Sequence, residues 1–360
     1  MLPSFTLVVA TALLCFMKRQ SRVVTAIAFA SLWILMGLNT ANADYALYKY
    51  LYDFKLLDAS GINAGYLAAE QIAWFLGLDF MQFRMLFSAV GLGLITLFIR
   101  RYSTCPNIVL ALYAFLPFMY DVVQFKFFLA ASIAIYSLRF LIDKPKFYGL
   151  KYGIGLYIAT LIHPASFLFI VFVVGLLDER NAFRVSLIAA AFVLIAVYSG
   201  LAQHISSFLL DSVKQGAYMT ELGRFGWIPY FVSGVGGVAL SYFSSSRRHC
   251  TELSRLDSAP LRFRRYFESA KYAYLPLLAM LPLSVQNFYR PIRCGNLLIL
   301  IFLSSFVFDG SDFSSGFPRT EIKAIGILFS AWLVFTQIIL YKGVIDIVLV
   351  TELTNNFLWS

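Results

Sequence analysis

The chain has 360 residues, of which 60% are hydrophobic and 13% are charged. A soluble domain of this length carries about a quarter charged residues, so the composition excludes a soluble globular protein. The net charge of +10 is explained by attraction to anionic lipid at a membrane surface, and it requires no nucleic acid as a partner.

Apolar runs follow one another almost from end to end of the chain. A helix needs about 20 apolar residues to cross a bilayer, and these runs, broken by charges, Gly and Pro, predict about twelve spans. They lie near 3–17, 23–39, 80–99, 107–124, 126–142, 147–162, 164–178, 184–201, 227–246, 271–289, 291–308 and 322–341. The predicted fold is therefore all-α, a polytopic transmembrane helical bundle that forms a single integral membrane domain over residues 1–360.

Basic residues divide the connections between these spans into two alternating sets. One set, counted with its flanks Arg139 and Lys151, holds 20 of the 29 Lys and Arg residues, in the segments near 18–22, 100–103, 143–146, 178–184, 247–271 and 318–323. Cytoplasmic loops are enriched in Lys and Arg, so this set is predicted to be cytoplasmic and both termini to lie outside. In the main cytoplasmic loop, 247–271, "RFRRYF" predicts a helix on the inner leaflet, with a partner-docking loop as the alternative.

Two outer loops are predicted, at about 40–79 and 202–226. The first combines acids with tyrosines; the residues are Asp44, Asp53, Asp58, Glu70, Asp79, Tyr45, Tyr48, Tyr50, Tyr52 and Tyr66. A tyrosine ring with its hydroxyl, next to a carboxylate, suits a sugar, although an interfacial aromatic belt has the same composition. Residues 66–78 are predicted to form a helix dipping into the membrane surface. The second loop contains Arg224 and is either a lid or an ordinary connection.

Three further outer junctions carry polar residues inside apolar sequence. Residues 107–142 are long enough for a hairpin, which places Asp121, Gln124 and Lys126 at its turn, where snorkelling and water lower the cost of charge. "LIHPAS" places His163 at a second turn, and "NFYRPIRC" places Arg290 and Arg293 at a third. Each site also has a purely structural alternative. Asp121 and Lys126 could only stabilise the turn, His163 could be a hydrogen-bonded core residue, and Arg290 and Arg293 could only anchor the chain at the membrane interface.

The shared sidedness of these residues indicates a chemistry. Arginines bind phosphate through paired hydrogen bonds, a His or a carboxylate can remove a proton from a hydroxyl, and apolar spans reach a lipid. The combination favours glycosyl transfer from a polyprenyl diphosphate carrier at the outer side of the inner membrane. The scattered cysteines, Cys15, Cys105, Cys250 and Cys294, form no CxxC, so we expect no disulfide framework, no metal site and no cofactor.

These residues also carry a family resemblance. "NADYALYKYLYD" (42–53), "NAGYLAAEQIAWFLGLDFMQF" (63–83), "YDVVQFKFFLAASIAIYSLRFL" (120–141), "LIHPASFLFI" (161–170) and "NFYRPIRCGNLLIL" (287–300) resemble segments of EpsG-like, Wzy-type polysaccharide polymerases. Two positions depart from the family pattern: Asn63 stands where the family has an acid before Gly-Tyr, and Lys126 stands where it has an arginine. A lysine keeps the charge but loses the planar fork.

The resemblance implies a glycosyltransferase with a GT-C-like membrane fold. It would join undecaprenyl-diphosphate-linked oligosaccharide repeat units at the periplasmic face of the bacterial inner membrane, for O-antigen, lipopolysaccharide, capsule or exopolysaccharide, with a chain-length regulator protein as a further partner. Arg290, Arg293 and Lys126 are predicted to bind the diphosphate, with Arg224, Gln124, Tyr45, Tyr48 and Tyr66 contacting diphosphate or glycan.

For the catalytic group, His163 ranks first as the base because cations favour its neutral form. Asp44 is predicted to orient sugar hydroxyls, and Asp121 to pair with Lys126 and hold the turn. The alternatives are another polyprenyl-phosphate-dependent transferase or ligase, and a flippase or transporter of the same lipid-linked glycan. A ligase is disfavoured by the small loop 202–226, and a transporter by the lack of similar halves.

Overall fold

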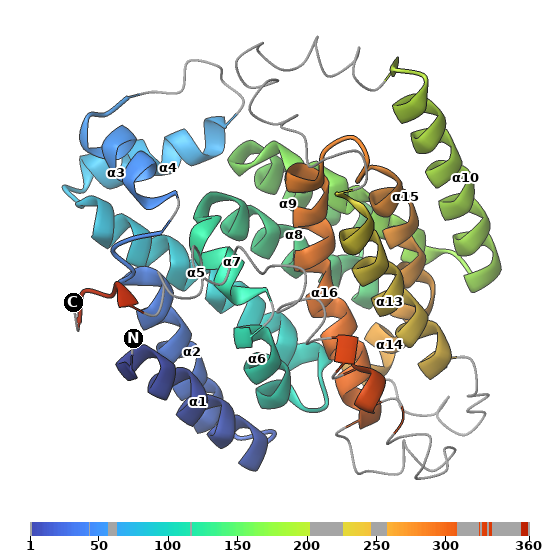
Figure 1. The fold of residues 1–360 in the computed structure, drawn as a ribbon, viewed down its shortest axis with the longest axis horizontal. Helices are drawn as coiled ribbons and strands as arrows, with labels where there is room; N and C mark the ends of the chain where they lie inside the picture. Colours follow the sequence, from blue (N-terminus) through green and yellow to red (C-terminus); the bar gives the residue numbers. More distant parts are fainter. Residues whose placement is uncertain are drawn as a thin grey trace.

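The computed structural model describes residues 2–42, 44–56, 63–115, 117–201, 226–245, 258–307, 324, 326–329, 331–332 and 354–358. Within these ranges the protein is all-helical, and the β pairing is limited to an isolated antiparallel bridge between Asn39 and Asn356. Figure 1 shows long helices packed alongside one another, with the short helices α3 and α4 together at one edge.

The helices follow the predicted spans closely in the first half of the chain. Their bounds are α1 Leu2–Met17, α2 Arg22–Gly37, α3 Tyr45–Asp53, α4 Ala64–Phe75, α5 Phe80–Tyr102, α6 Pro106–Phe115, α7 Phe118–Val123, α8 Phe125–Asp143, α9 Tyr148–Ile162, the 3₁₀ helix η1 Pro164–Leu176, α10 Glu179–Tyr198, α13 Ile228–Ser245, α14 Ala259–Ala270, η3 Lys271–Ala273, α15 Tyr274–Ala279 and α16 Val285–Val307. The helix predicted at 66–78 is α4. Loop 202–226 lies almost wholly outside the described residues, and most of the span near 322–341 does too.

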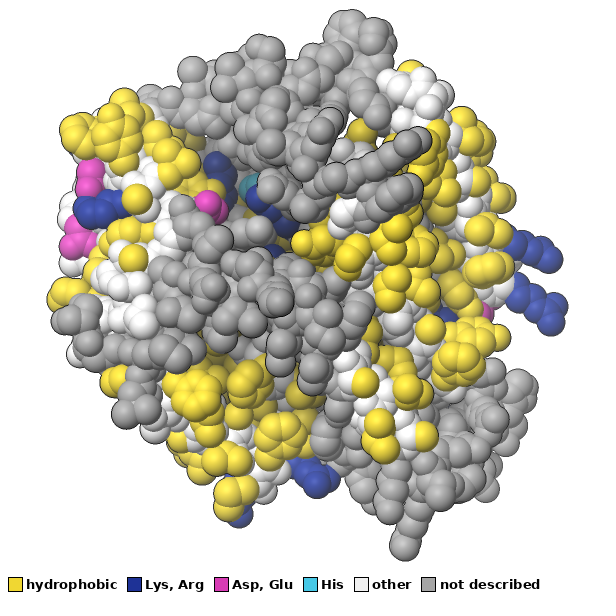
Figure 2. Space-filling view, in the orientation of Figure 1, with side chains coloured by type: hydrophobic (Ala, Val, Ile, Leu, Met, Phe, Trp, Pro, Cys, Tyr) yellow, Lys and Arg dark blue, Asp and Glu magenta, His cyan; other side chains and the backbone are white. Residues whose placement is uncertain are grey.

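Three of these helices are long and apolar enough to cross a membrane by length and composition: α5, α8 and α10. Several shorter helices are also apolar. Much of the outer surface is apolar too (Figure 2), and on α10 the side chains of Phe192 and Ile195 are 68% and 66% exposed. An apolar helix with an apolar exposed face is stable in lipid rather than in water. The helices therefore indicate a membrane protein.

Two predicted boundaries were wrong. The span predicted at 107–124 is broken into α6 and α7 around Pro117, because proline removes a helical hydrogen bond and clashes with the preceding turn. The turn predicted near residue 290 lies earlier, since α15 ends at Ala279 and α16 begins at Val285. Arg290 and Arg293 therefore lie in the first turns of α16 rather than in a connection.

The predicted cytoplasmic helix is present as α14, but its apolar face packs on protein. Phe263 packs edge-on against Phe98 with ring centroids 6.2 Å apart, and the Tyr266 hydroxyl donates to the Phe172 carbonyl at 2.6 Å. α14 continues directly through η3 into α15. Its amphipathic sequence thus anchors the end of a helical segment inside the bundle.

Asp143 joins three helices at the end of the bundle that contains the basic connections. It accepts hydrogen bonds from the Arg101 Nη2 at 2.7 Å, the Tyr102 hydroxyl at 2.8 Å and the Arg262 Nε at 3.0 Å. These groups belong to the end of α5 and the start of α14, while Asp143 ends α8. We call this region the Asp143 end.

Asp143→Asn is expected to lower the stability of the protein by about 1–3 kcal/mol, because an amide keeps the shape but loses the charge that both arginines bind. Thermal unfolding in detergent measures the change. The matched control is Asp53→Asn, which disrupts an exposed ion pair with Lys49 and should cost under about 0.5 kcal/mol. Equal effects of the two substitutions would contradict a structural role for the Asp143 end.

Candidate active site

The opposite end of the bundle brings together α4, α7, the start of α8, the end of α9 and the start of α16. α5 has 23 residues. At 1.5 Å per residue it is about 34 Å long, which separates this region from the Asp143 end by roughly one bilayer thickness. We call it the His163 end.

A buried ion pair links α7 to α16. Asp121, which is 2% exposed, accepts hydrogen bonds from the Tyr113 hydroxyl at 2.8 Å and from the Arg293 Nη2 at 3.2 Å. The same Arg293 nitrogen donates to the Gln124 Oε1 at 3.0 Å, and the guanidinium lies over the Tyr120 ring. A buried charge is stable only when it is paired and hydrogen-bonded, and this network meets that requirement.

This geometry corrects the predicted pair between Asp121 and Lys126. Gln124 separates α7 from α8 at the turn, and Asp121 faces α16. The Lys126 Nζ instead lies 4.4 Å from the centre of the Tyr66 ring on α4. The break between α7 and α8 at Gln124 falls within the predicted turn, but the partner of each charge depends on helices far away in sequence.

Glu70 lies on α4 one turn after Tyr66 and is 7% exposed. Residues four apart share a helix face, so Glu70 faces the same region as Tyr66 and Lys126. Burial raises the pKa of Glu70 to about 7, although the Lys126 charge opposes that rise. Glu70 is one of the acids of the predicted outer loop but not one of the predicted site residues, because an acid on a short amphipathic helix is usually solvent-exposed.

His163 lies between α9 and η1 and is half-buried. Its Nδ1 accepts a hydrogen bond from the Ala165 N–H at 3.2 Å, and its ring lies edge-on to Phe127 with centroids 5.1 Å apart. Burial and, to a smaller extent, the charges of Arg290 and Lys126 together lower the pKa of His163 to about 3. Both cations are therefore close enough to act on the imidazole.

Asp44 completes the group. It immediately precedes α3, is half-buried, and its pKa is raised by burial against the opposing charge of Arg290. Asp44, Glu70, Lys126, His163 and Arg290 form what we call the charged cluster. In Figure 2 the cyan histidine, which is the one histidine of the described residues, lies among dark blue and magenta side chains between the α3–α4 part and the α16 part.

The predicted tyrosines have different surroundings. Tyr45 packs edge-on against Phe80, and Tyr48 lies 6.4 Å from Tyr66 between ring centroids. Tyr66 is 4% exposed and presents its ring face to Lys126, while Tyr45 and Tyr48 are half-buried. Arg224 lies outside the described residues.

Arg84 is a buried cation that the sequence reasoning missed. It is 2% exposed, donates from Nε to the Met36 carbonyl at 2.9 Å and from Nη2 to the Val122 carbonyl at 3.1 Å, and lies near the rings of Tyr45 and Phe125. Its signal in the sequence was a single arginine within the apolar run "QFRMLFSAV". Arg84 ties α2, α5 and α7 together beside the charged cluster.

The close packing of α4 against α9 explains why the motif "NAGY" has a glycine at position 65. A Cβ at this position would lie 2.9 Å from the Leu161 Cβ and 3.1 Å from its backbone, so only glycine lets α4 approach the end of α9 this closely. The approach brings the α4 face carrying Tyr66 and Glu70 towards the turn that carries His163. The glycine next to Tyr66 in the motif thus allows the helix packing that brings the residues of the charged cluster together.

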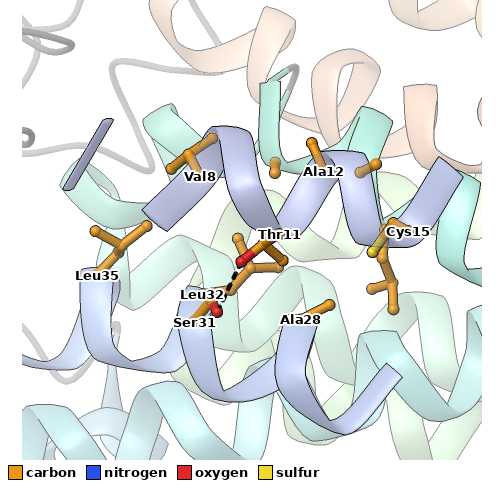
Figure 3. Close-up of a pocket in the computed structure, with 11 residues that line it drawn as sticks. Val8, Thr11, Ala12, Cys15, Ala28, Ser31, Leu32 and Leu35 are labelled. Atoms are coloured by element: carbon orange, nitrogen blue, oxygen red, sulfur yellow. Dashed lines mark hydrogen bonds between the residues drawn. The ribbon is translucent and has the colours of Figure 1, made fainter. Parts of the chain in front are cut away.

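A cavity between α1, α2 and α6 lies apart from this region (Figure 3). It holds about 10 Å³, which is room for a single water at most. The Thr11 hydroxyl donates to Ser31 across it at 2.9 Å, and its other lining side chains are mainly apolar. It is a packing gap between helices rather than a substrate site.

Within the described part of the chain, no group of His, Cys, Asp and Glu is arranged to hold a metal ion.

The model of the EpsG family matches residues 22–343, which covers the charged cluster, the buried ion pair and the Asp143 end. The chain belongs to the EpsG family. No curated protein and no solved structure matches it. The membership agrees with the resemblance read from the five short segments, and together with the apolar helices it indicates a membrane protein of polysaccharide synthesis.

Proposed function

We propose that this EpsG-family protein is a glycosyltransferase of the Wzy type. It joins undecaprenyl-diphosphate-linked oligosaccharide repeat units at the periplasmic face of the bacterial inner membrane. The observation that carries the proposal is the charged cluster, in which cations and carboxylates lie together at one end of an apolar helical bundle. The positive-inside pattern of the basic residues supports an outer location for that end.

The cluster fits both halves of the reaction. A diphosphate leaving group needs positive charge as its bond to the sugar breaks, and Arg290 and Lys126, whose charges both act on His163, can supply it. A sugar hydroxyl that attacks needs a group to accept its proton, and carboxylates lie in the same region. The surrounding exposed apolar faces suit a carrier that stays in the lipid.

Deletion of the protein from its host, followed by gel analysis of the surface glycan, tests the proposal. We expect the ladder of polymer lengths to disappear while a single repeat unit is still attached to the acceptor. Membranes containing the protein should also convert the lipid-linked oligosaccharide extracted from the deletion strain into longer chains. Loss of all glycan from the acceptor would instead identify a ligase or a flippase, and the polymerase proposal would be rejected.

A further inference from the structure

The hydrogen bond at the start of η1 determines which nitrogen of His163 carries the proton. The Ala165 N–H donates to Nδ1, so the His163 side chain caps the 3₁₀ helix with that lone pair. In a neutral imidazole one nitrogen is a donor and the other an acceptor. With Nδ1 accepting, the proton is on Nε2.

The neighbours of His163 keep the ring neutral. Arg290 and Lys126 both disfavour a third positive charge, and burial disfavours any charge. The neutral ring then offers its surroundings the Nε2–H, which is a hydrogen-bond donor without a free lone pair. A general base needs a free lone pair, and the one on Nδ1 is already engaged by the backbone.

Glu70 has what a general base needs and His163 lacks, which is an oxygen lone pair that can accept a proton. Its carboxylate is on the α4 face that also carries Tyr66, against Lys126, and Lys126 acts on both Glu70 and His163. A base works best when its pKa lies near the working pH, and burial brings Glu70 into that range. The ionisable groups that interact with Glu70 directly are Tyr52 of α3, Tyr66 of α4 and Lys126 of α8. Tyr48 and Arg84 act on its neighbour Tyr66, and Lys126 also acts on His163.

We infer that Glu70 accepts the proton of the attacking sugar hydroxyl and that His163 donates a hydrogen bond through Nε2–H to the departing diphosphate. The inference rests on the proposed function and replaces His163 as the base in it. It assigns a role to a residue, Glu70, that the sequence motifs did not single out.

The transfer balances as a single displacement. The hydroxyl oxygen of the acceptor repeat unit forms a bond to the anomeric carbon of the growing chain, and its proton moves to the Glu70 carboxylate. The bond between that carbon and the phosphate oxygen breaks, and the diphosphate leaves with the electron pair. Arg290, Lys126 and the His163 Nε2–H stabilise the negative charge that it gains. Glu70 then releases its proton to water.

Four variants separate this assignment from its rivals, with the lipid-linked oligosaccharide from the deletion strain as the substrate. Glu70→Gln should lower the polymerisation rate 10²–10⁴-fold, the usual effect of losing a general base. His163→Gln should keep much of the activity, because its amide N–H can replace the Nε2–H as a donor, whereas His163→Phe should not. Gln71→Ala is the matched α4 control and should retain activity, because Gln71 lies on the same helix but is exposed. Membrane abundance of each variant shows whether it folds.

The pH profile and the histidine tautomer test the same inference without relying on a loss of activity. The parent rate should fall as the pH drops below about 7, where Glu70 becomes protonated and stops accepting a proton. In ¹⁵N-histidine spectra at neutral pH, the signals absent from the His163→Gln protein should show a protonated Nε2 and an unprotonated Nδ1.

Three results would overturn the inference. The first is a Glu70→Gln protein that polymerises like the parent, and the second is a His163 ring protonated on Nδ1. The third is an acidic limb of the pH profile that disappears in Asp44→Asn, which would move the base to Asp44. If the parent itself extends no glycan, the proposed function fails, and that result is distinct from all three.

Discussion

We expect Arg290→Ala to reduce polymerisation 10²–10³-fold while the protein remains folded and membrane-inserted. Arg290 is half-buried at the start of α16, and its charge acts on both His163 and Asp44. It therefore lies where a leaving diphosphate would meet the rest of the charged cluster. Removal of a preorganised cation affects the transition state, in which the negative charge develops, more than it affects the fold.

Arg290→Lys should give an intermediate rate, because lysine keeps the charge but lacks the planar pair of donors that matches a phosphate. The rate is measured as chain extension of the lipid-linked oligosaccharide in membranes with equal protein content. Arg184→Ala is the matched control, since Arg184 is exposed on α10 near the Asp143 end. Full activity of Arg290→Ala at normal abundance would show that the residue is only an interfacial anchor.

Arg293→Met should have the largest effect on stability. It leaves Asp121 charged and buried without its cation, and breaking a buried ion pair in this way costs about 3–5 kcal/mol. The Gln124 side chain loses its donor at the same time. We expect a sharply lower unfolding temperature in detergent and little protein in the membrane.

The double variant Asp121→Asn/Arg293→Gln tests the cause. Two neutral amides can hydrogen-bond to each other, so much of the lost stability should return, with the coupling visible in a double-mutant cycle. Additive losses from the two single substitutions would contradict a direct pair. Recovery of stability without recovery of polymerisation would show that the pair also positions the start of α16 for catalysis.

These expectations give different roles to two arginines that the sequence motif does not distinguish. "NFYRPIRC" offers Arg290 and Arg293 as equivalent cations at one junction. They are three residues apart on a helix, and Arg293 is 3% exposed and bound to Asp121, whereas Arg290 is half-buried and acts on the charged cluster. We therefore interpret Arg293 as a positioning residue and Arg290 as the diphosphate ligand.

Much of the architecture could be predicted from the sequence because it depends on local composition. Apolar runs of sufficient length must form helices in lipid, where every backbone group needs an internal partner. The helices α1, α2, α5, α8 and α9 were predicted within a few residues for that reason, and α10 begins five residues before its predicted span. The family could also be predicted from the sequence, since the motifs of the family are short contiguous segments of the chain.

The partners of the polar side chains were decided only by the tertiary structure. Asp121 was predicted to pair with Lys126, five residues away, but it binds Arg293 from a helix 172 residues later. Glu70 and Arg84 gain their surroundings from α8 and α2, which no spacing along the chain reveals. A buried charge is stable only with a specific partner, and helix packing brings that partner close.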